Sequence, residues 1–336
     1  MDRKTWRNQV TEDALDPDLP IIDAHHHVWI GAPLIDLYEL YDPEWLYADK
    51  AGTGHNVIAT LFTDSHSAYR RDGPESLKVV GETEFAHEIA EEANRRGGRV
   101  AGACATIVAR ADMLLGSAVA EILDAHAAAS HRFRGVRHMV AWTPEMQIIP
   151  GVTGGEMGRP EFRAAIAELA KRDLSFDVYL LQPQLAELTD LARAFPGMRF
   201  ILDHLGTPMA VGRYAGKAAA GFADWKRDMA DLATCANVTV KLGGLNMGMA
   251  GVDATERDRP FSSREVATAQ REFVLTAIDL FGVDRCMFES NFPIDMRGIS
   301  YDIVWNGFKR ITQDFSPGER EALFAGTARR VYRVTL

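Results

Sequence analysis

Three consecutive histidines, His25, His26 and His27, end an apolar stretch near the start of the chain. In an extended strand, side chains two positions apart point to the same face. His25 and His27 therefore project together, and His26 faces the other way. Two imidazoles placed like that can share one divalent cation or hold one polar substrate. A solvated polar tract at a strand end is the alternative interpretation of this spacing.

Titratable or strongly polar residues also stand at the ends of most other apolar runs in the chain. Any one of them could be a helix cap or a loop hydrogen-bonding group, but their joint placement favours an enzyme. If the runs are strands of one barrel, these residues converge at its carboxyl-terminal end, where barrel active sites are built. They are Asp64, His66, Arg137, His138, Asp177, Tyr179, Gln182, Asp203, His204, Lys241, Glu289 and Asn291.

Two of these groups are cations that follow apolar strand residues, Arg137 and Lys241. A buried cation requires a partner, so either one could anchor a substrate carboxylate or stabilise an oxyanion. His204 ends a strongly apolar run, where a hydrogen-bonded core histidine is the alternative. Arg213 and Tyr214 stand in a glycine-flanked loop, where they either contact substrate or belong to an ordinary surface loop.

Short apolar or β-branched runs alternate with longer helical patterns along the whole chain. Eight such runs with helices between them predict a parallel sheet that closes into a (β/α)8 TIM barrel, a single domain. A doubly wound open sheet is the alternative, although no G-x-G-x-x-G follows the first strand. The predicted strands are Pro20–Val28, Asn56–Phe62, Arg99–Ile107, Phe133–Met139, Ser175–Leu180, Arg199–His204, Asn237–Leu242 and Arg285–Phe288.

Composition limits the classes of partner. The 336 residues are 47% hydrophobic and carry a formal net charge of −10, which argues against nucleic acid or an anionic membrane as the main partner. The three cysteines form no CxxC pair, and no apolar run approaches the roughly 20 residues of a membrane span. We expect a cytoplasmic protein with a small-molecule substrate, an amino-terminal extension over residues 1–19 and the barrel over residues 20–336.

With these residues assembled, the chain resembles the amidohydrolase superfamily, specifically its amidohydrolase 2 branch of TIM-barrel hydrolases. The resemblance runs in order from residue 20 to residue 295, and it is carried by five motifs. They are Ile22-Asp-Ala-His-His-His-Val-Trp29, Arg134-Gly-Val-Arg137, Asp203-His-Leu-Gly206, Val240-Lys-Leu-Gly-Gly-Leu245 and Met287-Phe-Glu-Ser-Asn-Phe-Pro293. The branch includes lactone hydrolases that act on sugar-acid lactones and pyrone dicarboxylate, and it also includes decarboxylases.

The resemblance implies that His25 and His27 match the family's strand-1 histidine pair and that His204 is a further strand-end ligand. The family's strand-8 aspartate, which ligates metal and accepts a proton from the attacking water, is replaced here by Asn291. A neutral amide is no general base and a weaker ligand for a divalent cation. Glu289 stands two residues earlier, and strand alternation would place it on the face of Asn291, as a substitute carboxylate and fourth metal ligand.

Two alternatives stay open at this point. Glu289 could instead form an ion pair with Arg137 or Lys241. The enzyme could also work without metal, as some lactonases of the branch are thought to do, with histidines and arginines polarising the carbonyl.

We therefore expect a hydrolase, specifically a lactonase that opens a lactone or related carboxylic ester by attack of water. One divalent ion, zinc or manganese, would activate the water, or Glu289 would act as its base. Arg137 and Lys241 would stabilise the oxyanion or hold a substrate carboxylate, and the remaining strand-end and loop residues would bind substrate. The alternatives are a metal-dependent decarboxylase, an amide hydrolase and a catalytically inactive binding barrel. The resemblance also allows self-association into a homo-oligomer.

Overall fold

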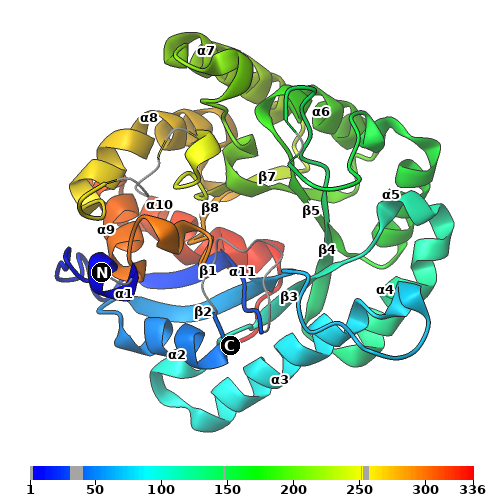
Figure 1. Ribbon diagram of the computed structural model, residues 1–336, viewed down its shortest axis with the longest axis horizontal. Coiled ribbons are helices and arrows are strands. Elements are labelled where there is room, and N and C mark those ends of the chain that lie inside the picture. Colours follow the sequence, from blue (N-terminus) through cyan, green and yellow to red (C-terminus); the bar gives the residue numbers. More distant parts are fainter. Residues whose placement is uncertain (1–2, 31–40, 147, 251, 253–256) are drawn as a thin grey trace.

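Eight parallel strands follow one another in chain order around a barrel, with helices on the outside (Figure 1). This computed structural model describes residues 3–30, 41–146, 148–250, 252 and 257–336. The strands are β1 (Pro20–His26), β2 (Asn56–Thr63), β3 (Thr106–Arg110), β4 (Phe133–Met139), β5 (Ser175–Tyr179), β6 (Arg199–Leu202), β7 (Val238–Leu242) and β8 (Cys286–Phe288).

The barrel closes just beyond the end of β8. The Asn291 amide donates to the His25 carbonyl at 3.0 Å, and the His27 amide donates to the Phe292 carbonyl at 2.7 Å. These bonds join the last strand's extension to the first strand, so the predicted single-domain (β/α)8 barrel is confirmed. The division into an extension of residues 1–19 and a barrel of residues 20–336 stays a prediction.

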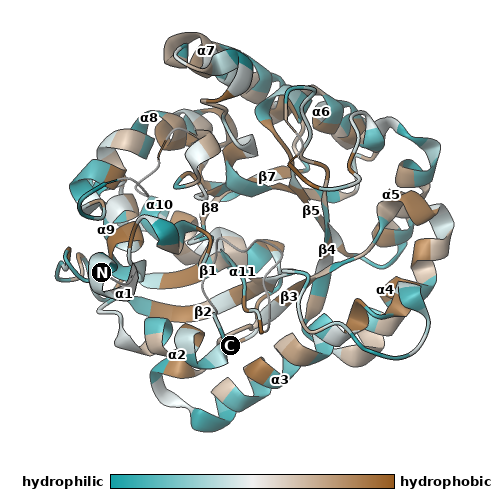
Figure 2. Cartoon of the chain, viewed as in Figure 1, coloured by the Kyte–Doolittle hydropathy of each residue, from teal (hydrophilic) through white to brown (hydrophobic). Residues whose placement is uncertain are grey.

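Most of the helices cover the outer face of the sheet (Figure 1). In α5 the buried residues Phe162, Ala165, Ile166 and Leu169 repeat at helical spacing and face the strands, and the hydropathy colours of Figure 2 alternate along such helices. The helices are α1 (Arg3–Arg7), α2 (Pro43–Gly52), α3 (Val80–Arg96), α4 (Val119–Ala129), α5 (Pro160–Lys171), α6 (Leu185–Ala194), α7 (Ala218–Ala233), α8 (Ser263–Phe281), α9 (Tyr301–Ile311), α10 (Pro317–Glu321) and α11 (Thr327–Val331). Among the described helices, none combines the length and the apolar character that crossing a membrane requires.

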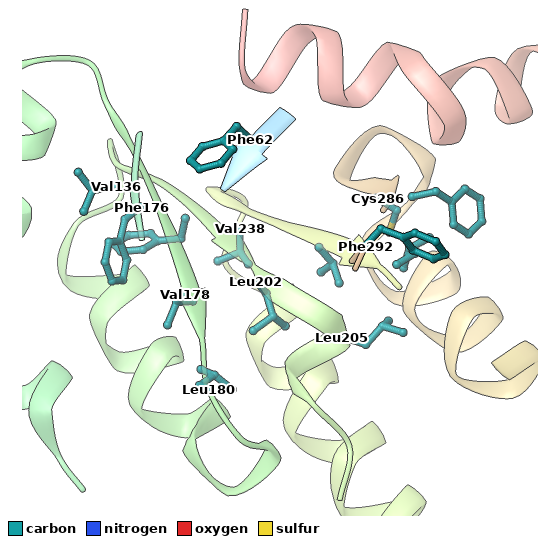
Figure 3. Close-up of a cluster of buried hydrophobic side chains, with 14 of the residues drawn as sticks. Phe62, Val136, Phe176, Val178, Leu180, Leu202, Leu205, Val238, Cys286 and Phe292 are labelled. Carbon is teal, nitrogen blue, oxygen red and sulfur yellow. The ribbon is translucent and has the colours of Figure 1, made fainter. Parts of the chain in front are cut away.

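Strand alternation separates an apolar outer face of the sheet from a mixed inner face. Val136, Phe176, Val178 and Leu202 point outward into the layer between strands and helices (Figure 3). The inner face is apolar at one end of the barrel only, where strand side chains meet the carboxyl-terminal segment, red in Figure 1. This inner cluster includes Ile22, Ala24, Ile201, Met287, Ala328 and Tyr332. The inward positions further along several strands carry charge, and they build the site described below.

Several predicted strand boundaries differ from the structure. β1 ends at His26 rather than Val28, and two other boundaries fail where the backbone is left-handed. β3 begins at Thr106 rather than Arg99, because Gly102 (φ 81°) and Cys104 (φ 49°) turn the chain first. A Cβ at Gly102 would lie 2.3 Å from the Ile58 carbonyl oxygen, so only glycine fits there. β6 ends at Leu202 rather than His204, because His204 has φ 54° within a tight turn.

Candidate active site

The histidine run of β1 divides between the two faces of the sheet. The His25 and His27 side chains lie together, with their Nε2 atoms 3.2 Å apart. His26 points the other way, with its ring near Phe62 and its Nε2 3.9 Å from the Cys104 sulfur. Burial lowers the pKa of His26 to about 3. The pairing of His25 with His27 therefore follows from strand alternation, as the sequence predicts.

His25, His204 and Glu289 form one compact group of potential metal ligands. One donor atom from each lies within 4.8 Å of the others, and all three side chains are buried. Glu289 Oε1 accepts from His204 Nδ1 at 2.7 Å and from the His204 amide at 3.1 Å, while Oε2 lies 3.1 Å from His25 Nδ1. His27 is outside this group, and its Nδ1 donates to the Thr63 carbonyl at 2.9 Å. Three of the four predicted ligands thus lie together, and a ligand role for all four stays a prediction.

Lys241 lies buried at the centre of the barrel beside this group. Its Nζ is 2.7 Å from Asp177 Oδ2, 3.0 Å from Asp203 Oδ1 and 3.1 Å from His25 Nδ1. Tyr332, from the carboxyl-terminal segment, also donates to Asp177. Burial works against the ammonium charge, but Asp177 and Asp203 outweigh it and raise the pKa of Lys241. Lys241 is therefore a fixed positive charge in this site.

Arg137 approaches His25 from the opposite side. Its Nε donates to Asp64 Oδ1 at 2.6 Å, a second guanidinium nitrogen donates to the Asp64 carbonyl, and Nη1 lies 3.4 Å from His25 Nε2. Among the described residues, neither Arg137 nor Lys241 forms an ion pair with Glu289, because His204 donates to its Oε1 and His25 Nδ1 lies beside its Oε2. The alternative of a Glu289 ion pair with one of these cations is wrong.

The carboxylate of Glu289 is held ionised. Burial alone would raise its pKa, but the positive charges that His204 and His25 can carry outweigh burial and lower it to about 2. Glu289 also shifts the pKa of His204. Burial alone would lower that pKa, but the Glu289 carboxylate outweighs burial and raises it. Glu289 and His204 therefore form a coupled pair, in which each charge stabilises the other.

The buried charges around His25 do not balance. Four carboxylates, Asp64, Asp177, Asp203 and Glu289, face two cations, Arg137 and Lys241. Asp177 receives hydrogen bonds from Lys241, Ser175 and Tyr332, yet burial and the neighbouring Asp203 outweigh these donors and raise its pKa. The raised pKa of His204 favours a third positive charge in the group. With all four carboxylates ionised, one negative charge is left uncompensated. Both oxygens of Asp203 and Oε2 of Glu289 are also without a well-directed hydrogen bond among the described residues. The site is therefore built to receive positive charge.

Asn291 does not stand beside Glu289 as strand alternation would place it. β8 ends at Phe288, and Asn291 adopts a left-handed backbone (φ 53°) that turns its side chain toward Asp295. Its Nδ2 donates to Asp295 Oδ1 at 2.9 Å, and Asn246 Nδ2 donates to Asp295 Oδ2 at 2.7 Å. Burial raises the pKa of Asp295 to about 6 despite these donors. Asn291 thus joins a buried amide–carboxylate network, which links the loops after β7 and β8.

Of the predicted substrate-binding residues, Tyr179 contacts the group formed by His25, His204 and Glu289. Its ring packs edge-on against His204 with 5.6 Å between centroids. His66 lies elsewhere, with its Nε2 2.9 Å from Arg110 Nη1 and 3.5 Å from Asp64 Oδ2. His138 lies 3.4 Å from a Glu156 carboxylate oxygen and accepts from the Met113 amide.

The other three predicted contacts hold loops together. The Gln182 amide donates to the Gly221 carbonyl and accepts from the Met209 amide. Arg213 is exposed, and the Tyr214 hydroxyl donates to Asp224 at 3.2 Å. A substrate-binding role for these residues stays a prediction.

Sequence reasoning assigned no role to four residues that complete the site. Asp64 and Asp203 were visible as polar strand ends, yet nothing in the sequence paired them with Arg137 and Lys241. Asp295 follows Asn291 by four residues, a spacing that could have suggested a local pair. Tyr332 had no signal at all, since only the closed barrel brings the carboxyl-terminal segment beneath Asp177.

A buried glutamate near Asp64 provides a pH-dependent test of this architecture. Glu82 Oε1 accepts from the Ser65 and Ser67 amides at 2.8 Å each, whereas Oε2 lacks a partner among the described residues. Burial, together with Asp64, raises the pKa of Glu82 from 4.5 to about 8. The folded state then holds a proton that the unfolded chain releases, so this contribution to stability is present below pH 4.5 and is lost as pH rises to about 8.

We expect Glu82→Gln, which stays neutral at every pH, to remove this slope. Wild type should lose about 1.4 kcal/mol of unfolding free energy per pH unit from this one proton over that interval, and the variant should not. Urea unfolding at several pH values measures the difference. Glu84→Gln, on the same helix but bonded to Arg70 at the surface, is the control. Equal slopes for wild type and Glu82→Gln would contradict the prediction.

Comparison with known proteins agrees with this geometry. The family model for amidohydrolases, Amidohydro_2, matches residues 22–334. The chain belongs to this amidohydrolase family. It is 33% identical over 333 residues to the protein y4mH of Sinorhizobium fredii, covering 94% of this chain and 99% of the relative. It is 26% identical over 317 residues to an L-fucono-1,5-lactonase of Burkholderia ambifaria, covering 93% of this chain and 95% of the relative.

A solved structure shares the fold. An amidohydrolase from Burkholderia multivorans, crystallised with bound zinc, superimposes with a TM-score of 0.70 at 24% identity, covering 94% of this chain and 99% of that one. As an amidohydrolase, the present chain carries its charged cluster at the end of the barrel where members of barrel families build their active sites.

Proposed function

We propose that this amidohydrolase is a lactonase, which opens a lactone or related carboxylic ester by attack of water. The observation that carries the proposal is the buried group of His25, His204 and Glu289 between the cations Lys241 and Arg137. Such a group offers a proton acceptor and fixed positive charge at one point, as ester hydrolysis requires. The similarity to an L-fucono-1,5-lactonase supports the same bond type.

The residues divide the chemistry between a base and an electrostatic clamp. Glu289 binds Nδ1 of His204, so the opposite nitrogen of that ring accepts the proton of the attacking water. The water oxygen bonds to the carbonyl carbon, and Arg137 and Lys241 stabilise the resulting oxyanion. When the ring C–O bond breaks, His204 returns the proton to the leaving alkoxide. The product is a hydroxy acid, whose new carboxylate faces the same two cations.

The residues also fit one divalent cation. His25, His204 and Glu289 would hold it, a nitrogen and oxygen donor set that suits zinc and is compatible with manganese. The fit rests on the uncompensated negative charge and on the unsatisfied Glu289 Oε2 described above. A cation bound there would replace the base formed by His204 and Glu289, because it would itself polarise the carbonyl and acidify the water. The zinc in the Burkholderia multivorans amidohydrolase supports this proposal.

The reaction class is tested by following acid and carbon dioxide separately. We expect purified protein to release acid from lactones, measured with a pH indicator, and to release no carbon dioxide from hydroxybenzoates. Carbon dioxide release without acid release would establish the decarboxylase alternative. Failure on both substrate classes, and on amides, would favour a binding barrel.

The metal proposal has a readout that does not depend on activity. We expect about one equivalent of zinc or manganese by elemental analysis, and a lower Tm after chelation, because a ligand present at 100 times its Kd adds about 2.7 kcal/mol to folding stability. Returning the metal should restore the Tm of wild type but not that of His25→Ala. Retained activity and an unchanged Tm after chelation, with no metal in the purified protein, would exclude a resident cation and favour metal-free hydrolysis.

A further inference from the structure

A third apolar cluster lies apart from the two that form the barrel core. Its centre is Ala141, Leu181 and Met209, all buried. The side chains packed around this centre are only partly buried, and we call this outer set the apolar wall. It consists of Ile148, Ile149, Tyr179, Val211, Tyr214 and Met249. These residues come from the end of β5 and from the segments after β4, β6 and β7, so the wall stands at the carboxyl-terminal end of the barrel.

The wall is continuous with the candidate active site through Tyr179. One edge of its ring packs against His204, with 5.6 Å between centroids. Its hydroxyl donates to the Met249 sulfur at 3.6 Å, and a thioether is a weak acceptor. The wall therefore starts beside the proposed base and extends outward from it.

The loops that carry the wall are tied to one another. The Ala210 amide donates to the Met249 carbonyl at 2.8 Å, which joins the loops after β6 and β7. The Arg213 amide donates to a Glu145 carboxylate oxygen at 2.7 Å, which joins the loops after β4 and β6. Such cross-links present the wall as a preformed surface.

We propose that the apolar wall binds a hydrocarbon substituent of the lactone, so that the preferred substrates are alkyl- or aryl-substituted lactones rather than polyhydroxylated ones. This inference rests on the proposed lactonase function and narrows its substrate class. The side chains of Ile148, Ile149 and Val211 contain no hydrogen-bonding atom. A sugar hydroxyl placed against them would lose its water without compensation, whereas an alkyl or aryl group would gain by leaving water.

The wall has the features of a binding surface rather than of ordinary core. Core residues of the other two clusters are covered by helices or by the carboxyl-terminal segment. The wall is formed by segments that extend beyond the strand ends, and its six side chains keep part of their surface exposed. Apolar side chains that gather beside a polar reaction centre are the usual construction of a small-molecule site.

The test compares three lactones with a common ring size. They are unsubstituted δ-valerolactone, δ-decalactone, which carries a pentyl chain, and D-glucono-δ-lactone. We expect kcat/KM for δ-decalactone to exceed that for δ-valerolactone by at least about tenfold, since each buried methylene contributes about 0.8 kcal/mol, or about fourfold. D-glucono-δ-lactone should be the poorest substrate. A preference for D-glucono-δ-lactone, or equal values for the two other lactones, would overturn the inference.

Variants test whether the preference for the pentyl chain depends on the apolar wall. Met249→Gln keeps side-chain length and adds an amide, and we expect it to lower the δ-decalactone to δ-valerolactone ratio at least about fivefold. Leu115→Gln makes a comparable change at a leucine that is 42% exposed and outside the wall, and it should leave the ratio as in wild type. If Met249→Gln folds, by its Tm and circular dichroism, and still keeps the wild-type ratio, the wall has no such role.

Calorimetry with lactams separates this inference from the proposed function. δ-Valerolactam and its pentyl derivative resist hydrolysis, and we expect the pentyl compound to bind at least about tenfold more tightly, with a negative heat-capacity change. If the pentyl lactam binds more tightly but no lactone is hydrolysed, the apolar wall binds hydrocarbon and the proposed lactonase function is wrong. Hydrolysis of lactones with no binding advantage for the pentyl lactam would reject the wall and uphold the lactonase.

Discussion

Glu289→Gln is expected to lower kcat/KM by about a thousandfold, because it removes the carboxylate that makes His204 a base. The exchange keeps the shape of the side chain but replaces the oxygen that binds His204 Nδ1 at 2.7 Å with a neutral amide group. The pKa of His204, which Glu289 raises, should fall, and this shift is measurable by NMR titration of the imidazole. Loss of activity together with a lower pKa is the signature of the coupled pair.

Glu187→Gln is the matched control, since Glu187 is a half-buried glutamate in α6. It should keep wild-type kcat/KM and the wild-type His204 titration. Should Glu289→Gln retain more than about a tenth of the wild-type rate, general-base catalysis by this pair would be excluded. A variant with an unchanged rate but lost metal would assign Glu289 to metal binding alone.

Lys241→Met is expected to reduce both stability and activity. The lysine is fully buried, and its removal leaves Asp177 and Asp203 uncompensated. Losing one member of a buried ion pair costs about 3–5 kcal/mol, and losing an oxyanion donor lowers the rate by about 10²–10³. Urea unfolding and kcat/KM measure the two effects separately.

A double variant separates the structural part of this effect from the chemical part. Asp177→Asn in the Lys241→Met background removes the uncompensated charge, so we expect it to restore about 1–3 kcal/mol without restoring activity. Lys171→Met, at an exposed lysine paired with Glu168, should change neither quantity. If Lys241→Met were as stable as wild type, and the double variant were no more stable than Lys241→Met, the ion-pair account would be wrong. If turnover hardly changed, the oxyanion role would be wrong.

The parallel barrel could be predicted from the sequence because it depends on local periodicities. Alternation within strands such as β4 and β5 sends Val136, Phe176 and Val178 outward while Arg137 and Asp177 point inward. The same period of two placed His25 opposite His26. These outcomes depend only on which face of an extended chain a side chain occupies.

The predictions from strand alternation failed where the backbone leaves the extended region. His204 and Asn291 both have positive φ, in turns that follow β6 and β8. For His204 the turn aims the ring at Glu289, and for Asn291 it aims the amide at Asp295. Histidine adopts a left-handed backbone more often than most residues but still uncommonly, and leucine adopts it only rarely. Their residue types therefore did not predict the turn at His204 and Leu205, and Gly206 was its one signal.

By itself, the sequence determined the barrel, the inward histidines and cations, and the departure of Asn291 from the family's aspartate, because each follows from residue type and position along a strand. Only the tertiary structure decided which charges meet. Glu289 binds His204 and His25, Lys241 binds Asp177 and Asp203, and Arg137 binds Asp64. These partners are 38 to 264 positions apart along the chain. Ion pairs select partners by distance in space, which the order of residues along the chain does not contain.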